Sequence, residues 1–252
     1  MSFWKELCIG LHRPMLAIAC GYLAFMLSIG VLVVLMGAWP PFMVVESRSM
    51  QHDDNVSAIG IIDTGDVIVV NSRQNGSSLR TYLGSMRDGY WSFGDRGDVV
   101  IFQPPGEDVP IVHRALCVVE YNSTAGGFDM PELADLPGQA WSVPDGGREW
   151  RGLTGWVDLY GIGHANVTVC IDLGGILRTM GDAPHGGLMT MGDNNWKEAD
   201  GERFGVVDQG SLVREPIKWE WVIGKVVGEV PWIGTVRLWL TGTAPPYMPV
   251  NS

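Results

Sequence analysis

The pattern of hydrophobic and polar positions begins with one long apolar run near the N-terminus. Residues 15–39 are apolar almost without interruption, and no charged residue occurs from Met15 to Val45. As a helix the run is roughly 37 Å long, which exceeds a hydrocarbon core of about 30 Å. The run therefore predicts a transmembrane helix, with Trp39 at the membrane interface and the two prolines after it ending the helix.

A cleavable signal peptide is the alternative to a permanent anchor. Its apolar core would be only about 7–15 residues long, followed by a small-residue cleavage site. The stretch 15–40 is longer, which favours an uncleaved anchor. Lys5 and Arg13 precede the run, and the first basic residue after it is Arg48. This asymmetry predicts a single-pass protein of the cell membrane, with residues 1–14 in the cytoplasm and the large domain outside.

Beyond the apolar run the pattern changes to short β-type segments. They are rich in β-branched residues and are bounded by Gly, Pro, Asp and Asn, as is typical of strands and turns. The predicted strand segments lie within 59–70, where a turn at 64–66 separates two strands, and at 94–102, 111–120, 156–160, 166–171, 188–193 and 219–230. Gly224 and Gly228 inside the last segment predict bulges. The polar stretch 71–89 is interpreted as a hairpin loop.

These segments predict a mostly β protein, in which the transmembrane helix is followed by an antiparallel β-sheet domain. We expect residues 41–120 and 188–230 to form its core and residues 121–187 to form a β-rich insertion. The C-terminal part, 231–252, contains an apolar stretch too short to cross a bilayer. It is compatible with an interfacial segment anchored by tryptophans, or with a helix packed on the domain.

Composition narrows the possible functions. The 252 residues carry a net charge of -11, which argues against a nucleic-acid partner because phosphate binding needs a basic face. No Cys-x-x-Cys pair occurs, so a zinc site is not expected. Cys117 and Cys170 either form a disulfide outside the cytoplasm or remain buried thiols. Four Asn-x-Ser/Thr triplets agree with an external domain, at Asn55, Asn75, Asn122 and Asn166.

Candidate chemistry begins with Ser49, which follows the apolar run by a few residues. A serine nucleophile needs a neighbouring base. His113 is the leading base because it lies inside an apolar strand segment, whereas His52 is too close to Ser49 in sequence for the usual geometry. The turn at 192–200 offers Asp193 and Asp200 as acids that could orient the base. No Gly-rich phosphate loop and no Gly-x-Ser-x-Gly motif occurs, so nucleotide binding and α/β-hydrolase chemistry are not expected.

Five short motifs occur in a fixed order behind the apolar helix. They are VESRSM at 45–50, Gly-Asp-Val at 65–67 and again at 97–99, IVHR at 111–114, MGDNN at 191–195 and VIGKV at 222–226. In this order they resemble the type I signal peptidases of the archaeal and endoplasmic-reticulum branch. The resemblance covers the anchor and a little over half of the chain.

The resemblance implies a membrane-anchored serine endopeptidase that removes signal peptides from secretory preproteins after small residues. Ser49 is then the nucleophile and His113 the general base. Asp200 completes the site, and Asp193 is also functionally important. The Ser47 hydroxyl and the Ser49 backbone N–H form the oxyanion hole. No cofactor and no metal is implied; the partners are the membrane, the preproteins and, as a candidate, the protein translocation channel.

The chain departs from the family pattern beside the nucleophile. Arg48 replaces the usual glycine, and His52 stands where a proline is common. Lys197, near the acidic turn, leaves a Ser–Lys pair as an alternative, and which of Asp193 and Asp200 faces His113 stays open. Because of Arg48, the sequence also allows an alternative function, that of a non-catalytic, membrane-anchored β domain that binds signal peptides or partner subunits.

Overall fold

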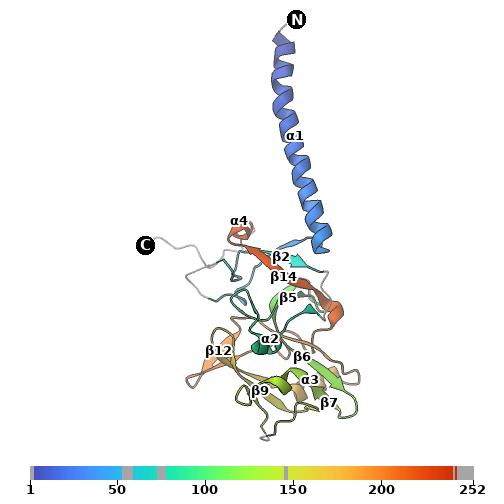
Figure 1. The fold of residues 1–252 in the computed structure, drawn as a ribbon, viewed down its shortest axis with the longest axis vertical. Helices are drawn as coiled ribbons and strands as arrows, with labels where there is room; N and C mark the ends of the chain where they lie inside the picture. Colours follow the sequence, from blue (N-terminus) through green and yellow to red (C-terminus); the bar gives the residue numbers. More distant parts are fainter. Residues whose placement is uncertain (1–2, 53–58, 73–77, 145–146, 241, 243–252) are drawn as a thin grey trace.

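The computed structural model describes residues 3–52, 59–72, 78–144, 147–240 and 242. A long N-terminal helix is followed by a mixed, mostly antiparallel β domain, from which the helix projects (Figure 1). Asn55 and Asn75, which begin two of the four Asn-x-Ser/Thr triplets, lie outside the described residues, as do residue 241 and residues 243–252 of the C-terminal segment.

The N-terminal helix α1 comprises Phe3–Met36. Its part Pro14–Met36 is long and apolar enough to cross a membrane, and none of its most apolar window is buried against the domain. This agrees with a membrane anchor or a signal sequence. The prediction that prolines end the helix is wrong, because Gly37 ends it in the left-handed conformation (φ 68) while donating to the Val33 carbonyl at 2.8 Å.

The first sheet contains seven strands, and all their pairings are antiparallel. In spatial order the strands are β1 (Phe42–Val44), β2 (Val67–Asn71), β14 (Val222–Val230), β5 (Val99–Phe102), β6 (Ile111–Asn122) and β11 (Gly187–Met191), with β7 (Gly127–Asp129) paired to the end of β6. Register shifts beside Gly224 and Gly228 confirm the predicted bulges. A Cβ at Gly224 would lie 2.5 Å from the Asn71 carbonyl oxygen, so only glycine fits there.

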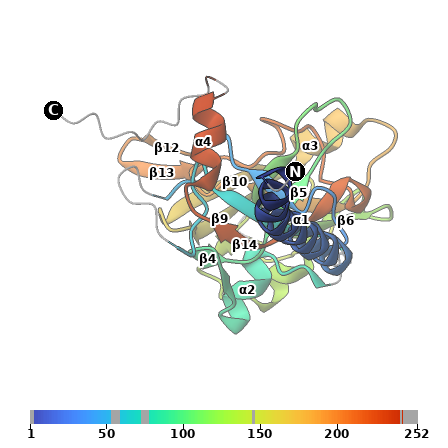
Figure 2. The same ribbon diagram turned by 90° about the horizontal axis from the view of Figure 1, so that it is seen from above.

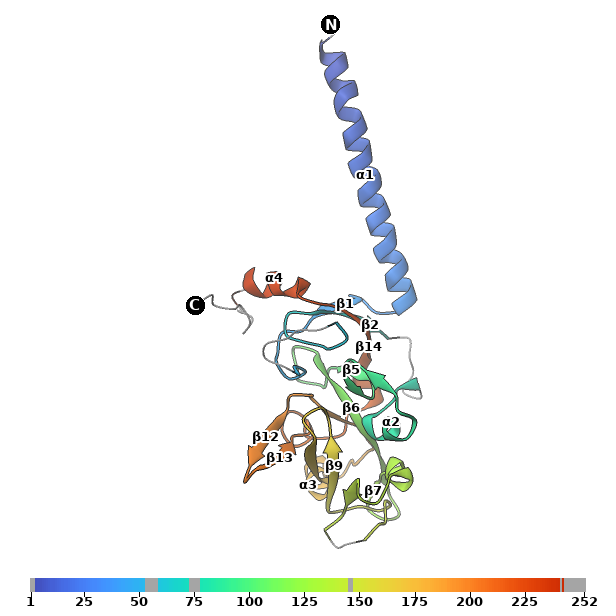
Figure 3. The ribbon, with the colours of Figure 1, turned by 60° about the vertical axis from the view of Figure 1, so that its left-hand side comes forward.

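A second sheet of five strands lies at the end of the domain far from α1 (Figure 3). Its order is β12 (Trp196–Ala199), β13 (Glu202–Gly205), β10 (Val167–Asp172), β9 (Trp156–Ile162) and β8 (Trp141–Ser142). β10 and β13 run parallel, so the expectation of a purely antiparallel fold is wrong at this pair. β12 and β13, expected in the core of the domain, extend the sheet that 121–187 builds. A two-stranded hairpin, β3 (Trp91–Ser92) with β4 (Asp95–Arg96), completes the strands.

Two short helices lie where the hydrophobic pattern predicts none. α2 (Tyr82–Asp88) occupies part of the stretch interpreted as a loop; the Thr81 hydroxyl accepts from the Gly84 N–H at 3.0 Å, and Gly89 ends the helix with φ 72. α3 (Leu173–Met180) begins at Asp172, whose carboxylate accepts from the Gly175 N–H. Capping explains both helices, because a side-chain acceptor satisfies the first free N–H groups. Two 3-10 turns, η2 (Pro131–Asp135) and η3 (Trp219–Trp221), connect strands.

The hydrophobic core is divided between the sheets. Its largest cluster joins the far part of the first sheet to the second sheet, and includes Leu116, Phe128, Leu159 and Met189. A smaller cluster lies under β1 and β2, nearer α1, and includes Met50. Each large apolar side chain buried in this way stabilises the fold by about 1.5–3 kcal/mol.

The C-terminal helix α4 (Ile233–Leu240) lies across the end of the domain that faces α1 (Figure 3). Viewed along α1, it lies to one side of that helix (Figure 2). Its buried residue Leu238 faces the domain, whereas Ile233, Val236 and Trp239 are each more than 60% exposed. Helix packing on the domain is thus observed, and an apolar face remains uncovered.

Candidate active site

The loop that carries Ser49 is fixed at both ends. At its start, the buried Val45 donates its N–H to the Asp66 carbonyl oxygen at 2.9 Å. At its end, Met50 is almost wholly buried in the smaller core cluster. Between these anchors Ser47 is exposed and Ser49 is half-buried, with their hydroxyl oxygens 3.0 Å apart. The loop therefore presents two adjacent hydroxyl groups at the surface of the domain.

The MGDNN turn holds the serine loop from the other side. The Asn194 N–H donates to the Ser49 carbonyl oxygen at 2.8 Å, and the Asn194 side-chain amide donates to the Arg48 carbonyl oxygen at 3.1 Å. A Cβ at Gly192 would lie 2.6 Å from the Ser49 carbonyl oxygen, so glycine is required for this approach. Two of the five motifs, far apart in sequence, thus meet at Ser49.

His113 lies on β6 and has a buried carboxylate partner, Asp208. Its Nδ1 is 2.6 Å from Asp208 Oδ2, and both side chains are at most 5% exposed. The Thr190 hydroxyl donates to the same carboxylate oxygen at 2.7 Å. A carboxylate accepts from an N–H at Nδ1, which assigns the imidazole proton to that nitrogen and leaves Nε2 able to take another. This is the arrangement of a general base and its orienting acid.

Asp193 has a different set of partners. Its two carboxylate oxygens accept from Arg114 Nε at 2.7 Å and Nη2 at 2.6 Å, and His52 Nε2 lies 2.8 Å from Oδ2. Burial alone would raise the pKa of Asp193, but the Arg114 guanidinium, with hydrogen bonds from Arg114 and His52, holds the pKa well below its usual range. Asp193 is therefore a buried anion that ties the serine loop to β6.

Asp200 is placed on the surface, away from these contacts. It is exposed at the turn between β12 and β13, with φ 54. The carboxylate bonded to His113 is thus Asp208, rather than Asp193 or Asp200 as the sequence suggested. The β12–β13 hairpin separates Asp208 from the MGDNN turn along the chain. The sequence feature that could have pointed to Asp208 is its position directly after the apolar pair Val206-Val207 and before the turn at Gly210.

Ser49 and His113 are brought to neighbouring elements without being bonded. Met191, the residue before Gly192, pairs with Arg114, the neighbour of His113, in the β11–β6 ladder. Within the described part of the chain, no hydrogen bond joins Ser49 to His113, and the recorded bond of Ser49 Oγ is with Ser47. Lys197, the alternative base, is exposed on β12. Catalytic hydrogen bonds are often long in a substrate-free site, so His113 remains the candidate base.

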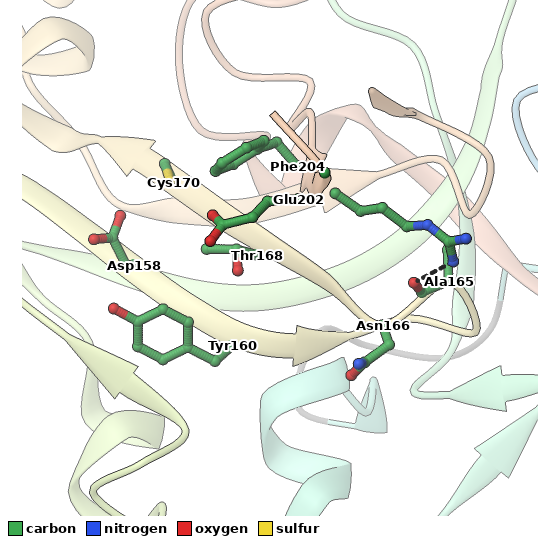
Figure 4. Close-up of a pocket in the computed structure, with 10 residues that line it drawn as sticks. Asp158, Tyr160, Ala165, Asn166, Thr168, Cys170, Glu202 and Phe204 are labelled. Carbon is green, nitrogen blue, oxygen red and sulfur yellow. Dashed lines mark hydrogen bonds between the residues drawn. The ribbon is translucent and has the colours of Figure 1, made fainter. Parts of the chain in front are cut away.

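A wide hollow of about 770 Å³ lies elsewhere, on the open face of the second sheet (Figure 4). Asp158, Tyr160, Cys170 and Glu202 line it, and it contains none of the predicted catalytic residues. Burial, followed by the bond to Asp158, raises the pKa of the Cys170 thiol to about 12, which makes this thiol a poor nucleophile. Cys170 and Cys117 are free thiols, so the alternative of a disulfide between them does not hold.

The described residues contain no group of three or more His, Cys, Asp or Glu side chains that could hold a metal ion. None of the protein-family models compared with the chain matches it, and neither does any of the curated protein sequences.

Proposed function

We propose that this protein is a membrane-anchored serine endopeptidase of the signal peptidase I type, which removes signal peptides from secretory preproteins. The observation that carries the proposal is the buried His113–Asp208 pair. His113 lies on β6, which pairs with β11, and β11 leads into the turn that holds Ser49. A histidine that accepts a proton on one nitrogen while a buried carboxylate fixes the other is suited to activate a serine. The order of the five motifs resembles that of signal peptidases, and this resemblance suggests signal peptides as the substrate class.

The proposed mechanism assigns one role to each group. Ser49 Oγ attacks the scissile carbonyl carbon and its proton passes to His113 Nε2. Asp208 stabilises the resulting imidazolium, and the developing oxyanion accepts hydrogen bonds from the Ser47 hydroxyl and the Ser49 backbone N–H. Each such donor contributes on the order of 3 kcal/mol in the transition state. His113 then protonates the leaving amine, and water, deprotonated by His113, hydrolyses the acyl-enzyme.

The substrate would bind as an extended strand. β1 is the edge strand of the first sheet, and it leads directly into the serine loop. A peptide added to a sheet edge gains main-chain hydrogen bonds, and shallow pockets then select its side chains. We propose that the residues before the cut are small at the first and third positions, as in signal peptides.

The apolar helix at one end of the domain supports the same function. The apolar helix α1 ends at the face of the domain on which α4 also lies, and the apolar residues of α4 are exposed there (Figure 1). We propose that α1 spans the membrane with the domain outside the cytoplasm, and that α4 rests on the same bilayer surface. Substrates held in that membrane would then reach Ser49 at a raised effective concentration.

The test compares the wild-type protein with Ser49→Ala on a secretory precursor in detergent. We expect the wild type to release the signal peptide and Ser49→Ala to release none above background, because the nucleophile is missing. Ser142→Ala, which changes a serine on β8 in the second sheet that is bonded to the Tyr160 hydroxyl, is the matched control and should cleave like the wild type. Equal processing by wild type and Ser49→Ala, or no processing by the wild type, would contradict the proposal.

A non-catalytic binding domain is the second candidate. Two observations favour it: Ser49 Oγ is bonded to Ser47, and the exposed Arg48 replaces a glycine beside the nucleophile. A binding domain would retain a signal peptide without cutting it, and Ser49→Ala would retain it equally. The precursor experiment separates the two functions, because only the peptidase converts the precursor into two fragments.

A further inference from the structure

Two histidine rings connect the serine loop to the inserted segment. The rings of His52 and His164 are stacked, with centroids 4.1 Å apart and planes inclined by 15°. His52 lies three residues after Ser49, and His164 lies in the turn between β9 and β10. The edge of the His52 ring also fits against Gly94, where a Cβ would lie 2.8 Å from His52 Cε1. The His52 ring is therefore contacted on one face by His164 and on one edge by Gly94.

The opposite side of His52 is bonded to the buried anion. Its Nε2 is 2.8 Å from Asp193 Oδ2, the oxygen that also accepts from Arg114 Nη2. Asp193 belongs to the turn whose next residue, Asn194, binds the Ser49 carbonyl oxygen. His52 thus closes a ring of contacts that runs from Ser49 through the MGDNN turn and back to the serine loop.

The turn that carries His164 is itself fixed. The Gly163 N–H donates to the Tyr82 hydroxyl on α2 at 3.0 Å, and Arg203 on β13 donates to the Ala165 carbonyl oxygen at 3.2 Å. Partial loss of water lowers the pKa of His164, and the neighbouring His52 lowers it further. A neutral ring can stack on His52 without the repulsion that two imidazolium ions would have.

We infer that the inserted segment positions the nucleophile: His164 braces His52, and His52 holds the serine loop against Asp193. Both histidines are positioning residues, since among the described residues no hydrogen bond or ring contact joins either of them to Ser49 Oγ or His113. Serine catalysis depends on the placement of the nucleophile, and small displacements lower the rate more than they weaken substrate binding. The kinetic part of this inference rests on the proposed peptidase function.

A double-mutant cycle on the full-length protein in detergent tests the coupling. We expect His52→Ala and His164→Ala each to lower kcat about 10-fold with KM changed less than about twofold. The double variant should be no slower than the slower single variant, because both remove one and the same brace. His164→Phe keeps a ring for stacking and should restore most of the rate. Thr168→Ala, on the next strand and facing the hollow, is the control for a change in the inserted segment.

Hydrogen exchange supplies a readout that needs no activity. The amides of Gln51 and Asn194 are bonded within the serine loop and across to it. In His164→Ala we expect exchange at both amides to be about threefold faster or more, with His164→Phe and Thr168→Ala close to the wild type. Unchanged exchange in His164→Ala, or independent effects of the two alanine substitutions on kcat, would overturn the inference. If the wild type cleaves no precursor, the peptidase proposal fails, while the exchange experiment still decides whether His164 braces the loop.

Discussion

At the scale of the residue, Asp208 is the acid that orients the candidate base, because its carboxylate is buried and lies within hydrogen-bond distance of His113. Asp208 is 1% exposed and shares its Oδ2 between His113 and Thr190, whereas Asp200 is exposed at a hairpin turn. A carboxylate in solvent gains little from an imidazole, while a buried one fixes its tautomer. The sequence offered the serine and the histidine as candidates, but the partner of the histidine depended on where the chain returns after β13.

Replacement of Asp208 gives the sharpest test of its role. We predict that Asp208→Asn lowers kcat by on the order of 10³-fold, because the amide no longer fixes the tautomer of His113 or stabilises its protonated form. Asp200→Asn should leave kcat within about twofold, since a surface change away from the site has a small effect. The measurement is precursor cleavage with both variants at matched folded concentration. A loss in Asp200→Asn with normal activity in Asp208→Asn would reverse the assignment.

At the scale of the element, α4 combines a buried side with an exposed apolar side. Gly234 lies so close to β1 that a Cβ would be 2.6 Å from a Val44 methyl group, and Leu238 is buried. The opposite side carries Ile233, Val236 and Trp239. The sequence stretch 231–240 predicted either an interfacial segment or a packed helix, and the helix is packed. The sequence could not show which side of this helix faces the domain, because the run is short and neither side carries enough charge to mark it as the exposed one.

A charge placed on the exposed side of α4 tests the membrane contact. We predict that Val236→Asp slows cleavage of a precursor in the same lipid bilayer about fivefold or more, because the carboxylate must stay hydrated. Cleavage of a soluble precursor in detergent should stay unchanged. Val109→Asp, at an equally exposed valine in the turn between β5 and β6, is the control. Equal rates of Val236→Asp and Val109→Asp in the bilayer would show that α4 makes no contact with it.

At the scale of the whole molecule, Asp66 connects three parts of the fold. Its carboxylate accepts from the Asp63 N–H at 2.8 Å and from the Trp232 N–H, just before α4, at 3.1 Å. Its carbonyl oxygen binds Val45 at the start of the serine loop. Burial, only partly opposed by these hydrogen bonds, raises its pKa from 3.8 to about 6. The charged form of this group is therefore less stable in the folded chain than in the unfolded chain.

This raised pKa predicts a pH-dependent stability. The folded chain keeps the Asp66 proton where the unfolded chain has released it, so the contribution is fully present below pH 3.8 and is lost as the pH rises through about 6. The loss is about 3 kcal/mol at most, at roughly 1.4 kcal/mol per pKa unit. Asp66→Asn should remove this part of the pH dependence of the free energy of unfolding, measured by denaturant titration at pH 4 and pH 7. Asp182→Asn, at an exposed turn, should retain it; the same slope in both variants would contradict the assignment.

The sequence by itself determined the apolar helix and the β character of the domain. Each is written locally: the length of the helix in uninterrupted hydrophobicity, and the strands in β-branched segments bounded by turn residues. Tertiary structure decided the parallel pairing of β10 with β13, the choice of Asp208 over Asp200, and the contact of His164 with His52. All three features depend on which distant segments of the chain become neighbours in the fold. The length of a hairpin or an insertion does not show beside which segment it will pack.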